Sequence, residues 1–154
     1  METPSFTFRL EQVRDIRERA EDQAREALSQ GIRHRDEGQM RFEEAHAEVR
    51  KACELNRAAV AGGQLTSAVN LRAIQTYVER TEQLRSSAEL ELSRREAEVQ
   101  AKRAHLAAAA RDRQAIDKLK ERQLAEHNAQ WARKNQNTLD ELALAVHRRG
   151  AVAA

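Results

Sequence analysis

The sequence Gly62-Gly63-Gln64-Leu65-Thr66-Ser67 separates two long segments that favour helix. Glycine readily adopts the left-handed backbone conformation that ends many helices. Thr66 or Ser67 can then accept a hydrogen bond from a free N–H group of a following helix. The rest of the chain holds three further glycines and one proline, Pro4. We therefore predict a turn at 62–65, between a helix of about 6–61 and a helix of about 66–148.

The composition agrees with long helices. Ala, Arg, Glu, Leu and Lys supply 88 of the 154 residues, above the roughly 50% that is typical of coiled coils and long helices. The 27 basic and 25 acidic residues nearly cancel, so the chain lacks the high net charge of disordered proteins. We predict one all-α domain over residues 1–154, without a sheet or a disulfide scaffold.

Apolar residues recur in steps of three, four or seven on both sides of the turn: Leu10, Val13, Ala20, Ala24 and Ala27, then Phe42, Ala45, Val49 and Ala52, and later Leu92, Val99 and Leu106. This spacing keeps one stripe of each helix facing a partner helix, which predicts an antiparallel two-helix coiled-coil hairpin. Gly31 and Gly38 lie inside the helical pattern, where each costs about 1 kcal/mol relative to Ala. They predict a soft stretch with a local change in packing.

The two predicted helices differ in length. At 1.5 Å per residue they measure about 84 Å and about 124 Å. Folding at Gly62-Gly63 makes residue i face a position near 126 minus i, so that Phe42 meets Leu84 and Tyr77 meets Val49. Beyond about residue 122 the longer C-terminal helix overhangs without a partner from its own chain, and residues 149–154 are expected to fray.

This overhang carries large apolar residues at helical spacing, which we call the C-terminal surface: Leu124, Trp131, Leu139, Leu142 and Val146. Exposed apolar surface of this kind commonly marks a protein-binding site. We therefore predict that a partner protein docks there. The alternatives are that the chain dimerises or that this end frays.

The sequence shows no chemistry typical of an enzyme. The five histidines lack the neighbours of a zinc site and are expected to be solvated, and Cys53 is expected to be a small buried hydrophobe. No phosphate-binding glycine loop or nucleophile elbow occurs. We predict no catalytic residue, no cofactor and no metal.

Nucleic acid and membrane insertion are also disfavoured. Basic residues gather at 111–122, but Asp112, Asp117 and Glu121 dilute them, so this stretch is interpreted as a solvated face or a face for an acidic partner rather than a phosphate-binding stripe. No stretch has the length and apolarity of a membrane span, and the N-terminus lacks the layout of a signal peptide. A cytoplasmic location is expected.

Four segments resemble the FliJ family of the bacterial flagellar export apparatus: residues 8–19 (FRLEQVRDIRER), 72–77 (RAIQTY), 118–122 (KLKER) and 139–143 (LDELA). The resemblance covers nearly the whole chain and rests on the order and spacing of the segments. It implies a non-enzymatic stalk, similar to the rotor stalk of rotary ATPases, that couples a hexameric export ATPase to the cytoplasmic domain of the membrane export gate. It also implies assistance to export chaperones and a place on the inner face of the membrane at the flagellar base.

In this family the surface that faces the export gate lies on both helices near the middle of the hairpin. Position by position, the resemblance assigns to it seven residues, which we call the mid-helix surface: Phe42, Ala45, Val49, Ala73, Tyr77, Arg80 and Leu84. The C-terminal surface would then serve the ATPase hexamer. Two alternatives stay open for the whole chain, namely a stalk of a virulence secretion system or rotary ATPase, and a generic coiled-coil dimeriser or scaffold.

Overall fold

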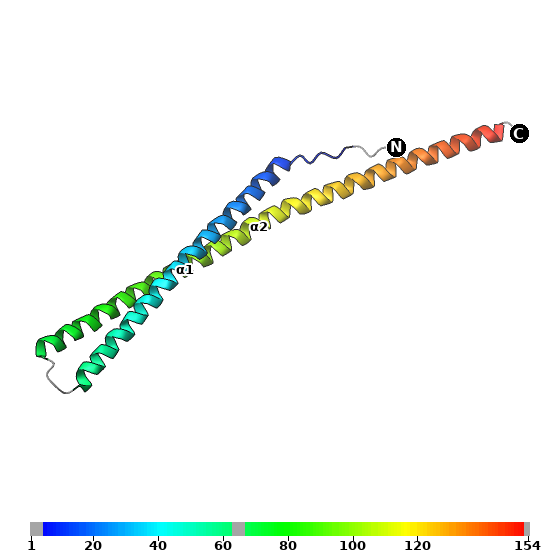
Figure 1. The fold of residues 1–154 in the computed structure, drawn as a ribbon. Coiled ribbons are helices and arrows are strands. Elements are labelled where there is room, and N and C mark those ends of the chain that lie inside the picture. Colours follow the sequence, from blue (N-terminus) through cyan, green and yellow to red (C-terminus); the bar gives the residue numbers. More distant parts are fainter. Residues whose placement is uncertain (1–4, 63–66, 153–154) are drawn as a thin grey trace. The chain divides into compact units, whose positions relative to one another are not determined.

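The computed structural model describes residues 5–62 and 67–152, with side chains up to residue 148. Two long helices pack against each other, α1 over Glu11–Ala61 and α2 over Ala68–Val152 (Figure 1). The described residues contain no strand. No helix in the described part of the chain is long and apolar enough to cross a membrane.

The two helix ends that flank residues 63–66 each carry a hydrogen bond, whereas most of the predicted turn at 62–65 lies outside the described residues. The N–H of Gly62 donates to the carbonyl oxygen of Ala58 at 3.0 Å, which ends α1. The hydroxyl oxygen of Ser67 accepts from the N–H of Val69 at 3.4 Å, so Ser67 is a cap of α2. Thr66, the other candidate cap, lies outside the described residues.

Helix α1 begins at Glu11, five residues later than predicted, because residues 5–8 are not helical. The ring of Phe6 lies 5.6 Å from that of His127, centroid to centroid. Phe8 is 6% exposed, and the Lys120 ammonium lies 5.8 Å from the centre of its ring. Alternate residues of an extended segment point to the same side, whereas a helix would turn these two rings to different faces. Because residues 5–8 are not helical, both rings lie against side chains of α2.

The internal contacts divide the chain into two compact units. The first unit holds Met1–Glu21 and Ala109–Ala154, and the second holds Asp22–Ala108. Each unit contains part of α1 and part of α2. The single domain that the sequence suggested stays a prediction.

In the second unit, α1 presents small residues at intervals of seven: Ala24, Gly31, Gly38, Ala45 and Ala52. A side-chain carbon added at Gly31 would lie 2.9 Å from Cδ of Lys102, and one added at Gly38 would lie 3.0 Å from Cδ of Arg95. Both glycines are buried. These glycines make room for two long basic side chains of α2, and the prediction of a soft stretch stays a prediction.

The contacts in this unit join increasing positions of α1 to decreasing positions of α2, which is consistent with an antiparallel pair. The positions add to 133 for Gly31 and Lys102 and to 125 for Glu48 and Tyr77. The predicted total of 126 lies at the low edge of this range, because α2 begins only after Ser67. Leu92 and Val99 are buried on α2, seven residues apart as the sequence indicates.

In the first unit, ion pairs join the two helices. Glu11 binds Lys120 at 2.7 Å and Arg14 binds Asp117 at 2.9 Å. Arg17 binds Asp112 at 2.9 Å, and Glu21 binds Arg113 at 2.6 Å. The charges along α1 run negative, positive, positive, negative, and each meets the opposite sign on α2. The 111–122 stretch is therefore not simply a solvated face or a face for an acidic partner, because four of its charged residues pair within the chain.

Candidate partner-binding surfaces

The C-terminal surface lies on one side of α2. At about 100° per residue, its five members fall within roughly a quarter of the helix circumference. Leu139, Leu142 and Val146 are all more than half exposed, and Val146 reaches 71%. Trp131 is half-buried. The sequence pattern thus placed these side chains on a common face, and four of them are exposed, with Leu124 the least exposed of the four at 40%.

Leu124 differs from the rest of this surface, because it lines a shallow groove beside α1 together with Arg14, Asp117 and Lys120. Phe6 reaches still further along α2, to His127. The prediction that α2 has no partner from its own chain beyond about residue 122 is therefore wrong for Leu124 and His127. Sequence reasoning missed this because it treated residues 6–10 as helix.

A further exposed leucine, Leu144, is 59% exposed and was not part of the predicted surface. It is two residues from both Leu142 and Val146, so at about 100° per residue it lies on nearly the opposite side of the helix from each of them. It is therefore separate from the C-terminal surface. The signal for it was present in the sequence, as a large apolar residue that breaks the three-four spacing.

The mid-helix surface divides between the two helices. Its α2 members are exposed: Ala73, Tyr77, Arg80 and Leu84. Its α1 members are half-buried: Phe42, Ala45 and Val49. Leu84 is 56% exposed, so most of its side chain lies outside the helix pair. The sequence analysis had placed it opposite Phe42. The α2 members therefore form the accessible part of this surface.

Phe42 is packed along its own helix. Its ring stacks on the ring of His46, four residues later, with the centroids 6.0 Å apart and the planes inclined by 23°. One face of the Phe42 ring is therefore covered by the next turn of α1. The four-residue spacing of an aromatic residue and a histidine could have predicted this contact from the sequence.

Tyr77 bridges the two helices through its hydroxyl group, which donates to Oε2 of Glu48 at 3.2 Å. The Lys51 ammonium binds the same carboxylate at 2.6 Å. The hydrogen bond from Lys51, followed by that from Tyr77, lowers the pKa of Glu48 below its usual value. Glu48 in turn raises the pKa of Lys51. The ring of Tyr77 is thus held beside α1 and remains 39% exposed.

Glu48 and Lys51 were not predicted as site residues. Their sequence signal is an acid and a base three residues apart, a spacing that recurs on many helix surfaces. What distinguishes this pair is the tyrosine on the other helix, which only the register of the two helices brings within reach.

Within the described residues, no three His, Cys, Asp or Glu side chains come together in a way that could hold a metal ion. Cys53 is a free, half-buried thiol. The expectation of five solvated histidines fails for His127, which is half-buried and has a buried Nδ1 without a hydrogen-bond partner.

Comparison with known families matches residues 6–151 to the family described as flagellar FliJ protein. No curated protein and no solved structure matches the chain significantly. The family match spans nearly all of the 154 residues. The chain therefore belongs to the FliJ family, a non-catalytic component of flagellar export.

Proposed function

We propose that this member of the FliJ family is a stalk that couples a hexameric flagellar export ATPase to the membrane export gate. The observation that carries the proposal is the family match over residues 6–151. The two exposed surfaces of the helix pair support it. In this function the ATPase carries out the chemistry, and the chain transmits force or conformation between its partners.

The arrangement that suits this role is an antiparallel coiled-coil hairpin with an overhanging C-terminal helix. We assign the C-terminal surface to the centre of the ATPase hexamer, because Leu139, Leu142 and Val146 share one side of α2 and are exposed. An apolar helix face of this kind gains stability when a partner removes it from water. Assistance to export chaperones and a position on the inner face of the membrane at the flagellar base belong to the same proposal.

The mid-helix surface is assigned to the cytoplasmic domain of the export gate. Tyr77 is its main anchor, because aromatic side chains are enriched among the residues that contribute most to protein contacts. The hydrogen bond from Tyr77 to Glu48 fixes the ring before a partner arrives. A ring that is already held in place loses less side-chain entropy on binding.

Stimulation of ATP hydrolysis tests the assignment of the C-terminal surface. We expect the purified hexameric export ATPase to be stimulated by the full chain and much less by a variant that carries Leu139→Gln, Leu142→Gln and Val146→Gln. Leu144→Gln is the matched control, because it removes an equally exposed leucine from the other side of α2. Equal stimulation by the triple variant, or by a chain that ends before Leu124, would show that this surface does not act on the ATPase.

Binding to the gate domain tests the second surface. Tyr77→Ala should weaken binding while helix content stays near that of the wild type, and Tyr77→Phe should retain most of the affinity because it keeps the ring. An unchanged affinity for Tyr77→Ala would remove Tyr77 from the surface. A large fall in the melting temperature of Tyr77→Ala would instead make Tyr77 part of the core.

A further inference from the structure

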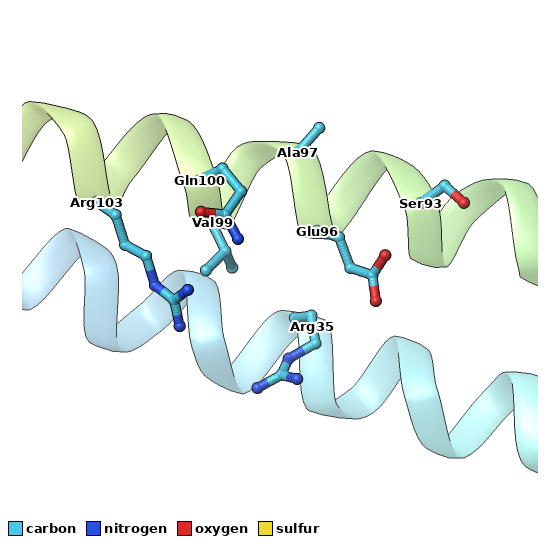
Figure 2. Close-up of a pocket in the computed structure, with 7 residues that line it drawn as sticks. All are labelled: Arg35, Ser93, Glu96, Ala97, Val99, Gln100 and Arg103. Atoms are coloured by element: carbon cyan, nitrogen blue, oxygen red, sulfur yellow. The ribbon is translucent and has the colours of Figure 1, made fainter.

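A groove runs along the seam of α1 and α2 in the second unit, with a volume of about 420 Å³. Arg35 lines it from α1, and the other side is formed by α2 residues that include Ser93, Glu96, Val99, Gln100 and Arg103. Figure 2 shows Arg103 and Val99 reaching from α2 toward α1, and Arg35 lying below Glu96. Val99 is 4% exposed, so the floor of the groove is apolar and its rim is charged.

The two arginines of this groove have hydrogen-bond donors without an acceptor among the described residues. Nη2 of Arg35 binds Asp36 at 2.9 Å, but its Nε is buried and has no hydrogen-bond partner. Arg103 is exposed and takes part in none of the ion pairs between described residues. By contrast, Arg95 in the same seam donates to the carbonyl oxygen of His34 at 2.7 Å. A buried donor without an acceptor is costly, so an acceptor that enters this groove would be stabilised.

We propose that the groove binds an acidic segment of another protein, with one carboxylate between the guanidinium groups of Arg35 and Arg103. A carboxylate matches the planar, forked donors of arginine and forms stronger hydrogen bonds than a neutral acceptor. Glu96 makes no ion pair with any described residue and repels a second acidic group at its end of the groove. The two arginines outnumber the single acidic residue of the lining, which favours the binding of one carboxylate.

This groove is distinct from the mid-helix surface. Glu96 and Arg103 each lie four residues after a buried position of α2, namely Leu92 and Val99. Tyr77 lies one residue before Val78, a half-buried position that continues the same inward-facing stripe of α2. In a heptad pattern these two placements fall on opposite flanks of the inner stripe. The proposal therefore stands without the functions assigned to the other two surfaces.

Binding of a fluorescein-labelled hexaglutamate peptide to the full chain tests the proposal, measured by fluorescence anisotropy at constant low ionic strength. We expect Arg35→Gln and Arg103→Gln each to weaken binding about tenfold, since each removes charge-assisted hydrogen bonds. Glu96→Gln should strengthen binding because it removes a repulsive charge. Arg94→Gln is the matched control, as it changes the same charge at an exposed position on the other flank of α2, and it should bind like the wild type.

Three results would overturn the proposal. The first is an absence of saturable binding by the wild type, with circular dichroism showing that the chain is folded. The second is an equal loss of affinity in Arg94→Gln and Arg103→Gln, which would indicate general charge attraction. The third is displacement of the peptide by inorganic phosphate as effective as displacement by unlabelled hexaglutamate, because the groove would then take any small anion rather than an acidic protein segment.

Discussion

At the scale of single residues, the two buried glycines of α1 differ in what lies against them. Gly31 faces the aliphatic part of Lys102, whose flexible end can move. Gly38 faces Arg95, which is tethered by its hydrogen bond to the carbonyl oxygen of His34. Replacing a helical glycine by alanine is favourable by about 1 kcal/mol when there is room. The neighbour's freedom to move therefore decides the sign of each substitution.

We expect Gly31→Ala to raise the free energy of unfolding by about 0.5–1 kcal/mol and Gly38→Ala to lower it. Arg95→Ala combined with Gly38→Ala should recover stability relative to Gly38→Ala alone, because the obstructing side chain is gone. Chemical denaturation followed by circular dichroism measures all three. If both glycine substitutions stabilise the chain equally, the tether on Arg95 is not what makes Gly38 necessary.

The pairing of Glu11 predicts a dependence of stability on pH. The hydrogen bond from Lys120 lowers the pKa of Glu11 below its ordinary value of 4.5, and Arg14 adds to this effect. A carboxyl group with a lowered folded pKa stabilises the fold above its unfolded pKa, and this contribution is lost as the pH falls through the folded value. The melting temperatures of the wild type and of Glu11→Gln should therefore differ at pH 7 and converge as the pH falls below 4.5 and through the lowered pKa of Glu11.

Glu126→Gln serves as the control for this series, because Glu126 is exposed and makes no ion pair with any described residue. Its melting temperature should follow that of the wild type from neutral to acidic pH. A difference between Glu11→Gln and the wild type that persists unchanged into acid would mean that Glu11 acts by packing rather than by charge.

At the scale of whole elements, the non-helical residues 5–8 before α1 are held in place by the burial of Phe8. Phe8 is 6% exposed, and burying a phenylalanine side chain contributes about 1.5–3 kcal/mol. Phe8→Ala should therefore release this segment and speed hydrogen exchange at the start of α1 and near Lys120. Exchange in the second unit should change little. Ile16→Ala, at a position 61% exposed, should leave the pattern unaltered.

The start of α2 depends on a different kind of contact, the cap formed by Ser67. Ser67→Ala should cost about 1 kcal/mol of stability, and Ser67→Asp should restore most of it, since aspartate also accepts from the free N–H groups. Thermal unfolding measures both changes. Thr66→Ala offers a comparison, and a larger loss from Thr66→Ala than from Ser67→Ala would identify Thr66 as the more important cap.

The two helices also show which structural features could be predicted from the sequence alone. Both long helices and the buried positions Leu92 and Val99 followed from composition and spacing, because helix periodicity is a local property. The register of the helices followed only in part, because it depends on contacts between distant residues. Tyr77 lies beside Glu48, one residue from the predicted position 49, whereas Gly38 meets Arg95 rather than a residue near 88. Spacing did not identify Glu48 as the hydrogen-bond partner of Tyr77 or bring the two arginines of the groove together, because both depend on side-chain contacts between the helices.

At the scale of the whole molecule, the exposed face of α2 bears on whether the chain pairs with itself. A generic dimeriser would bury Leu142 and Val146 against a second copy, whereas a stalk keeps them free for a different protein. We expect the purified chain to sediment as a monomer at micromolar concentration, with Trp131 fluorescence that does not shift on dilution. A stable homodimer whose Trp131 emission moves to longer wavelength as it dissociates would favour the dimeriser. In that case the variant with Leu139→Gln, Leu142→Gln and Val146→Gln should become monomeric, and Leu144→Gln should not.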